Sequence, residues 1–303
     1  MTLITILLVL ALERYWRKLD VYGLFARVVQ LAQLLLKRYG NSRWMNSSLG
    51  VVLVIAPLMV ATAIIQNYLA CQPGFPAWLV LLAFSVTVLI LSIGDKRFSL
   101  YVKQYLAAWQ KQDMEAACRY LNDMTHEDIT FENPMQLNHR FLEVLLGRVN
   151  ERLLAILFWF VVLGPLGAVF YRSVAQLKSV QKESSAAAGF IDAATRLKLI
   201  LDWFPARLTA VCYALSGSFV DAFHAWHEQT AQLSGSTLTH NRHILTSTGL
   251  GALQLHDFYT EESAELDSET VSRHVEHAHA LIRRTVITWL TVLALLTLVG
   301  WLA

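Results

Sequence analysis

Two short charged motifs beside apolar segments are the first places where this sequence could do chemistry. Glu13 and Arg14 follow an apolar N-terminal stretch, and Tyr171 and Arg172 end another. An ionisable residue inside or at the edge of a membrane segment is a functional-site candidate, and an arginine at a helix end can bind a phosphate or a headgroup. The alternative is that both motifs only mark the edge of the membrane.

A third motif, residues 202–209, combines an acid, a proline and an arginine in an apolar setting. Pro205 suits the first turn of a helix, where its missing N–H costs nothing, and the sequence predicts that this helix ends near Gly217. Arg207 would lie one turn into the helix among apolar residues, where it needs an anion or a carboxylate partner. Both partners stay open at this point, a ligand or an internal acid such as Asp202.

The histidines and cysteines give weaker signals. His274 and His277 are three residues apart, so they share one helical face as two metal ligands would. Histidines beside acids in loops are more often solvated or pH-sensitive groups, so we expect no metal site. The cysteines have no metal spacing and are predicted to be unpaired thiols: Cys71, Cys118 and Cys212.

The elements that must position these residues are membrane helices. Of the 303 residues, 55% are hydrophobic and only 16% are charged, with a mean hydropathy of +0.43, whereas a soluble domain has about 25% charged residues. Residues 44–94 contain no Asp, Glu, Lys or Arg, and neither do residues 153–171 or 285–303. Because a crossing needs about 20 apolar residues, the sequence predicts a polytopic membrane protein and excludes soluble, disordered and disulfide-rich secreted classes. The net charge of +2 gives no indication of nucleic-acid binding.

The organisation predicted is all-α, a single membrane domain over 1–303. Its clearest part is a transmembrane hairpin over 49–93, turned at Pro73-Gly74. The other membrane segments are expected near 1–16, 153–171, 205–220 and 284–303, and the polar helical insertions at 95–152 and 221–282.

Three details of topology follow from charge. Residues 13–43 carry seven Lys/Arg against two acids, which places them and 95–152 on the cytoplasmic side. Within residues 13–43, the stretch 21–36 suits an amphipathic helix on the membrane surface. The stretch 153–171 is either a full crossing, favoured by its length, or a re-entrant segment broken at Gly164-Pro165, favoured by the basic residues after it.

The order of several short motifs along nearly the whole chain resembles the AmpE family of bacterial inner-membrane proteins. That family is distantly similar to the cobinamide-phosphate synthases of the CobD/CbiB type. The motifs that carry the resemblance are Leu12-Glu13-Arg14, Gly94 with Tyr105-Leu106-Ala107-Ala108-Trp109, Leu157-Phe158-Trp159 with Gly164-Pro165 and Tyr171-Arg172, Pro205-Ala206-Arg207-Leu208-Thr209-Ala210, and Arg283-Arg284-Thr285.

The sequence departs from the synthases where they carry acids. Ala175-Gln176-Leu177-Lys178 replaces one acidic pattern, and Arg196-Leu197-Lys198-Leu199 replaces another. A ligase that uses ATP needs carboxylates to hold Mg²⁺, and a lysine can bind phosphate but cannot replace them. The resemblance therefore implies a retained scaffold with a basic, anion-facing pocket, and no catalytic residue or cofactor.

The function implied is regulation of an inducible β-lactamase and of the response to peptidoglycan stress. We hypothesise one polar site at the cytoplasmic interface for an anionic lipid headgroup, nucleotide or muropeptide, lined by Glu13, Arg14, Tyr171, Arg172, Asp202, Arg207 and Thr209. Membrane lipids and a protein of cell-wall recycling are the further partners expected. The alternatives are an ATP- and Mg²⁺-dependent amide ligase of the synthase type and a transporter of a cell-wall metabolite.

Overall fold

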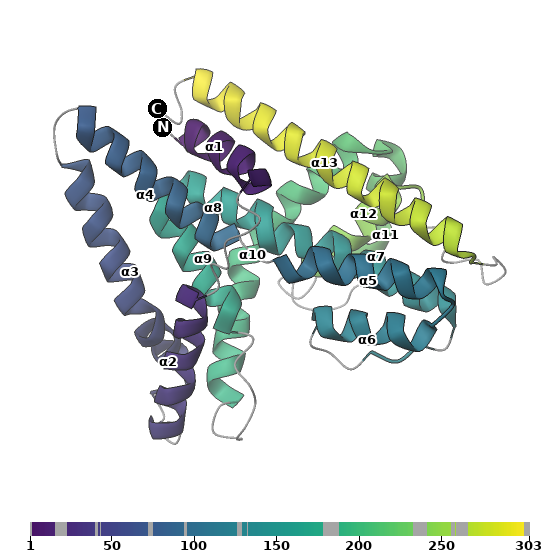
Figure 1. Cartoon of the computed structure of the whole chain (residues 1–303), viewed down its shortest axis with the longest axis horizontal. Coiled ribbons are helices and arrows are strands. Elements are labelled where there is room, and N and C mark those ends of the chain that lie inside the picture. Colours follow the sequence, from purple (N-terminus) through teal and green to yellow (C-terminus); the bar gives the residue numbers. More distant parts are fainter. Residues whose placement is uncertain are drawn as a thin grey trace. The chain divides into compact units, whose positions relative to one another are not determined.

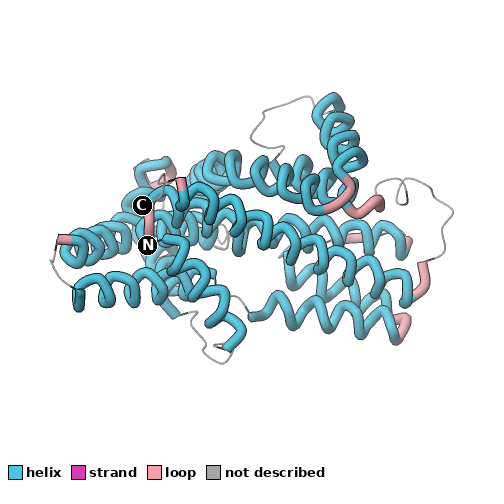
Figure 2. The backbone as a smooth tube through the Cα atoms, turned by 90° about the horizontal axis from the view of Figure 1, so that it is seen from above, coloured by secondary structure: helices cyan, strands magenta, loops and turns pink. Residues whose placement is uncertain are grey.

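The computed structural model of the chain describes residues 2–15, 23–39, 42, 44–71, 75–93, 96–125, 129–131, 133–177, 188–232, 241–255, 258 and 266–299. These parts are mostly helical and contain no strand, which confirms the all-α prediction (Figure 2). They form two compact units. The first comprises residues 1–94, 151–203 and 293–303, and the second comprises 95–150 and 204–292.

Three helices of the described chain are long and apolar enough to cross a membrane, so this is a membrane protein. They lie at Ser48–Ala70, within Trp78–Gln110, and at Ser268–Leu298. In the first unit, α3 (Ser48–Ala70) and α4 (Phe75–Ile93) lie next to each other as the predicted apolar hairpin (Figure 1). Backbone in lipid must satisfy its own hydrogen bonds, and uncharged helices of this length do so.

The rest of the first unit packs around this hairpin. α1 (Thr2–Tyr15) contacts α4, and α2 (Gly23–Tyr39) contacts α3. A π-helical turn, η1 (Asn150–Leu154), leads into α8 (Ala155–Leu163), which is followed by α9 (Pro165–Leu177). α9 packs on α2, α3 and α4.

The apolar stretch 153–171 does not form one continuous helix. Gly164 has φ +67°, a left-handed conformation that ends α8, and Pro165 then begins α9. The two helices fold against each other so closely that a Cβ on Gly167 would lie 2.0 Å from the Trp159 carbonyl oxygen. Gln66 of α3 accepts the Leu166 N–H at 3.3 Å and so satisfies one of the first donors of α9. With nine residues, α8 is too short to cross a bilayer alone.

The helix predicted to start at Pro205 starts much earlier, so this prediction is wrong. α10 runs continuously from Ala188 to Ser216 with Pro205 inside it. A proline inside a helix removes the hydrogen bond to the carbonyl four residues before it, which here is that of Leu201. Trp159 of α8 donates its indole N–H to this carbonyl at 3.2 Å. The neighbouring helix thus supplies the donor that the proline lacks, and the helix continues.

The second unit contains the two polar insertions and has a large apolar core. Its helices are α5 (Lys96–Gln110), α6 (Met114–Thr125), α7 (Pro134–Val149), α11 (Phe219–Gln232) and α12 (Asn241–Ala252), with parts of α10 and α13 (Ser268–Leu298). Asn133 caps α7 by accepting the Gln136 N–H at 2.8 Å, where Asn133-Pro134 indicates a break. The core includes the stacked rings of Tyr105 and Phe141, with centroids 3.7 Å apart.

Candidate functional site

A buried ionic network lies in the first unit, and we call its four members the Lys198 network: Glu151, Tyr171, Lys198 and Asp202. The Lys198 ammonium forms an ion pair with Glu151 at 2.7 Å and a second one with Asp202. Tyr171 donates its hydroxyl to the other oxygen of Asp202 at 2.7 Å. Lys198, Asp202 and Tyr171 are all buried, and the Glu151 side chain is the most accessible member, with 30% of its surface exposed.

Three helical elements bring the network together. Lys198 and Asp202 are four residues apart on α10, and this spacing places them on the same helix face. Tyr171 comes from α9, and Glu151 comes from the π-helical turn η1. A π-turn holds one more residue than an α-turn and is often found at functional sites, and here it carries the one acid of the network with access to solvent.

Burial and charge oppose each other inside the network. Burial alone would lower the pKa of Lys198, but the Glu151 and Asp202 carboxylates outweigh it and hold this pKa above its ordinary value. Burial raises the pKa of Asp202, against the pull of the Lys198 ammonium. Lys198 is therefore firmly charged, and the two carboxylates compete for it.

The structure brings two of the seven predicted site residues into contact, Tyr171 and Asp202. Arg172 follows Tyr171 in α9 and is buried, with 8% of its surface exposed. Glu13 and Arg14 are at the end of α1, and their side chains lie outside the described residues.

The other two predicted residues belong to the second unit. Arg207 donates to the Asn241 side chain at 2.9 Å, and the buried Thr209 hydroxyl donates to Asn150 at 2.8 Å. Arg207 thus has a neutral amide as a partner. Asp202, one of the partners left open for Arg207 by the sequence, is bound by Lys198 and Tyr171.

Sequence reasoning missed Glu151 and Lys198 as site residues. Lys198 could have been found, because a lysine four residues before an aspartate is the spacing of a helical ion pair. The predicted helix start at Pro205 hid this pair, since it left both residues outside the helix. Nothing in the sequence indicates that Glu151, 47 positions before Lys198, lies beside it.

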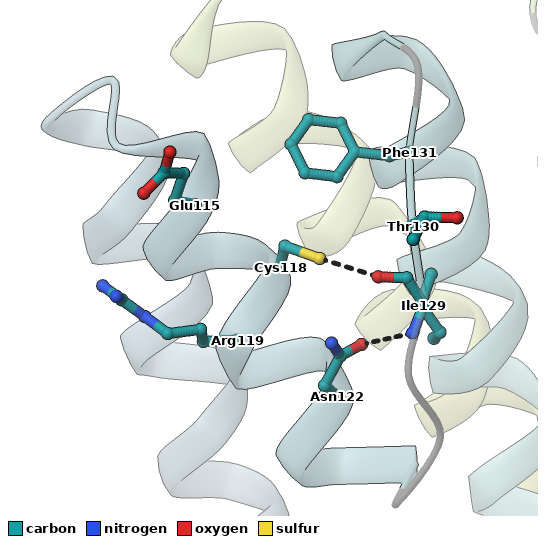
Figure 3. A pocket seen from close by; sticks show the side chains of 7 residues that line it. All are labelled: Glu115, Cys118, Arg119, Asn122, Ile129, Thr130 and Phe131. Atoms are coloured by element: carbon teal, nitrogen blue, oxygen red, sulfur yellow. Dashed lines mark hydrogen bonds between the residues drawn. The ribbon is translucent and has the colours of Figure 1, made fainter.

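A pocket of about 310 Å³ lies on α6 of the second unit (Figure 3). The Cys118 thiol donates to the Ile129 carbonyl at 3.2 Å, and Asn122 accepts the Ile129 N–H at 3.0 Å. Both polar groups thus serve to hold the segment 129–131 against α6. Burial raises the pKa of Cys118, which disfavours the reactive thiolate.

The predicted unpaired thiols are confirmed, since none of the three cysteines forms a disulfide. The histidine pair shows no metal geometry in the part of the chain that is described, where no group of three metal-ligating side chains occurs. His274 instead packs edge-to-face against the Phe258 ring, with centroids 5.1 Å apart.

Comparison with known proteins identifies a matching family. The family model described as "Regulatory signalling modulator protein AmpE" matches residues 1–303. Protein AmpE of Shigella flexneri is 27% identical over 235 residues, which cover 75% of this chain and 78% of that protein.

The chain is also similar to proteins named for cobalamin biosynthesis. The CobD protein of Stutzerimonas stutzeri is 28% identical over 244 residues, 77% of each chain. That of Chromobacterium violaceum is 25% identical over 220 residues, 71% of this chain and 67% of the other. No solved structure matches at a significant level.

Proposed function

The chain belongs to the AmpE family, and on this premise we propose that it is a multi-pass regulatory protein of the bacterial inner membrane that binds an anionic ligand at the Lys198 network. The process regulated is the induction of a β-lactamase during peptidoglycan stress. The ligand is an anionic small molecule, a muropeptide, a nucleotide or a soluble headgroup, and the signal passes to a protein partner of cell-wall recycling.

One observation carries this proposal: a buried lysine is held by two carboxylates, and one of them is partly exposed. Lys198 can balance one negative charge, and Asp202, bound also by Tyr171, is the more deeply held of its two acids. Glu151 therefore occupies the place that the acid group of a ligand would take. A charge-assisted bond from Lys198 to a ligand phosphate or carboxylate would replace the bond to Glu151, and the buried Arg172 next to Tyr171 is a second cation of the same unit.

Exchange of the anion gives the protein two states. In one state Glu151 is bound to Lys198 and the π-turn η1 is fixed to α10. In the other state the ligand holds Lys198, and η1 is released to change its winding. A ligand shifts such an equilibrium only by its difference in affinity for the two states, and the competition with Glu151 supplies that difference.

The experiment is ligand binding to the purified full chain in detergent, measured by native mass spectrometry and by thermal shift. The ligands are a muropeptide, a nucleotide with and without Mg²⁺, and glycerol phosphate. Glu151→Gln removes the competing charge while it keeps the size of the side chain, so it should bind the anion about tenfold more tightly, a difference of about 1.4 kcal/mol. A bound ligand stabilises the fold in proportion to its occupancy, so the thermal shift should increase in parallel.

The second variant is Lys198→Met with Asp202→Leu, which removes both buried charges together and so avoids an unpaired ion. It should fold and lose binding. Arg196→Gln is the matched control, because Arg196 is an exposed residue of the same helix paired with Asp192. The proposal is wrong if the double variant still binds, or if no ligand binds the wild type.

A ligase of the synthase type is the second candidate, favoured by the similarity to CobD proteins. In the structure both carboxylates of the network are bound to Lys198, and Mg²⁺ would have to compete with its ammonium. The nucleotide experiment separates the two functions. Binding that depends on Mg²⁺ supports the ligase, whereas binding without metal supports the regulator.

A further inference from the structure

One face of α2 is exposed and carries an unusual mixture of side chains. Arg27, Leu31, Leu34 and Arg38 follow one another at spacings of four, three and four, which places them in a single stripe along the helix. All four are exposed, and Leu34 is 65% exposed. Two leucines thus lie between two arginines on an exposed face of the helix.

The opposite face of α2 is already used for packing. Phe25, Val28 and Ala32 are buried, and α2 contacts α9 and α3. Burial of these residues fixes the rotation of the helix, so the stripe is held outward by the fold itself. The inner face of α2 therefore packs within its own unit, and the stripe lies on the other side of the helix.

The turn after α2 adds an aromatic pair next to the stripe. Tyr39 and Trp44 have ring centroids 5.9 Å apart, both are about two-fifths exposed, and the Arg38 guanidinium lies 5.8 Å from the Tyr39 ring. The turn is rigid. Met45 is fully buried, and a Cβ on Gly50 would lie 2.2 Å from the Met45 carbonyl oxygen.

Residue Ser48 begins α3, a helix apolar enough to cross the membrane, directly after this turn. Exposed tyrosine and tryptophan at the end of a membrane helix are typical of the headgroup layer. Leucines flanked by arginines are typical of a helix that lies in that layer. These observations set the depth of the stripe at the level of the headgroups.

We propose that the outer face of α2 and the turn to α3 bind the anionic phospholipid headgroups of the leaflet, with Arg27, Lys37 and Arg38 on the phosphates and Leu31 and Leu34 among the upper acyl chains. The charge of the segment favours this occupant over a second protein chain. Residues 13–43 carry seven Lys/Arg against two acids, and an anionic leaflet attracts such a segment. The site is separate from the Lys198 network and does not depend on the function proposed for it.

The test compares binding of phosphatidylglycerol and phosphatidylcholine to the purified full chain by native mass spectrometry in detergent. Each basic residue near an anionic surface contributes a factor of about five. Lys37→Gln with Arg38→Gln should therefore lower phosphatidylglycerol binding about 25-fold and leave phosphatidylcholine binding unchanged. The charge-preserving exchange Lys37→Arg with Arg38→Lys should bind like the wild type, and it controls for disruption of the helix end.

Lys111→Gln with Arg119→Gln is the matched control, since these are an exposed lysine and an exposed arginine of the second unit. It changes the net charge equally and should keep the preference for phosphatidylglycerol. The proposal is overturned if the wild type shows no such preference, or if both glutamine pairs reduce it equally. Lys37 and Arg38 lie on α2, outside the Lys198 network, so Lys37→Gln with Arg38→Gln should leave muropeptide binding unchanged. Failure here and failure of the proposed function can therefore be told apart.

Discussion

The two parts of helix α10 hold their buried polar side chains in opposite ways. Before Pro205, Lys198 and Asp202 are charged and form ion pairs within the first unit. After Pro205, Thr209 and Tyr213 are neutral, and they donate to the Asn150 side chain and to the Leu146 carbonyl within the second unit. One continuous helix therefore buries charged side chains in ion pairs before Pro205 and neutral side chains in hydrogen bonds after it.

Buried ion pairs and buried neutral hydrogen bonds differ in their contribution to the free energy of folding. A neutral buried hydrogen bond contributes about 1 kcal/mol net, whereas each buried ion costs several kcal/mol in lost hydration. Packing alone explains the neutral bonds of the second unit. It gives no reason for the charges of the first, because apolar residues of similar size are often equally stable in such places. The Lys198 network is therefore a stronger functional candidate than the neutral hydrogen bonds of the second unit.

The largest predicted effect comes from Lys198→Met, which breaks the buried pair and leaves two carboxylates without a cation. The loss in unfolding free energy should be about 3–5 kcal/mol. Arg196→Gln breaks an ion pair with the same spacing on the same helix, but the side chains are 76% and 60% exposed, so it should cost less than about 0.5 kcal/mol. Thermal unfolding in one detergent measures both.

The double variant Lys198→Met with Asp202→Leu sharpens this result. It should recover most of the loss, because the remaining acid, Glu151, has access to solvent. If it is no more stable than the single variant, the cost of Lys198→Met comes from packing and not from unpaired charge.

A pair of tyrosines tests the same contrast at the level of one hydroxyl. Tyr171→Phe removes a bond to the Asp202 carboxylate and should cost about 2 kcal/mol, since bonds to charged groups are the stronger ones. Tyr213→Phe removes a bond to a neutral carbonyl, 3.0 Å long, and should cost about 1 kcal/mol. Equal losses in urea unfolding would contradict the distinction between the two parts of the helix.

The boundary between the two parts is tested by the Trp159 indole. Trp159→Phe removes the donor to the Leu201 carbonyl and should cost about 1 kcal/mol beyond the loss of ring area. In a Pro205→Ala background the backbone N–H of residue 205 can satisfy that carbonyl, so this part of the loss should disappear. A double-mutant cycle measures the coupling, and a coupling of zero would show that the indole does not replace the missing helix bond.

The smallest effect concerns pH, and it has opposite signs in the two units. Hydrogen bonding from Thr270 at the start of α13, first by its side chain and then by its N–H at 2.9 Å, lowers the pKa of Asp267 below 3.8. Its contribution to stability is present above pH 3.8 and is lost as the pH falls through the lowered value. The Tm of the wild type should exceed that of Asp267→Asn by about 2 °C or less at neutral pH, and the gap should close in acid.

Asp202 should behave in the reverse sense, because burial raises its pKa. Compared with Asp202→Asn, the wild type should lose stability as the pH rises from 3.8 through the raised value. Tm measured against pH for the wild type and both variants checks the two signs. The same sign for Asp202 and Asp267 would contradict the assigned environments.

Much of the fold could be predicted from the sequence, because membrane helices are set by local composition. The uncharged run 44–94 is long enough for two crossings and contains a turn signal, so the hairpin of α3 and α4 needed no other information. Gly164-Pro165 indicated where the stretch 153–171 could break, but the length of that stretch also allowed a full crossing, so the sequence left the two alternatives open.

The candidate site was only half predictable. Tyr171 and Asp202 could be named from their types and positions. Lys198, the cation that pairs with Asp202, is not predicted, because Pro205 suits a helix start and so separates the two residues from the predicted helix. A proline in a helix leaves a carbonyl without a donor, and only the tertiary structure shows that Trp159 fills that place. Local sequence rules do not contain this compensation.

The sequence by itself determined that this is an all-α membrane protein, where its apolar hairpin lies, and which family it resembles, because hydropathy and short motifs are local properties. The tertiary structure decided which charges meet. Glu151 reaches Lys198 through the π-turn η1, Asp202 binds Lys198 and Tyr171, and Arg207 binds Asn241. A charge takes whichever partner the packing of distant helices brings within hydrogen-bond distance, and spacing along the chain does not fix that choice.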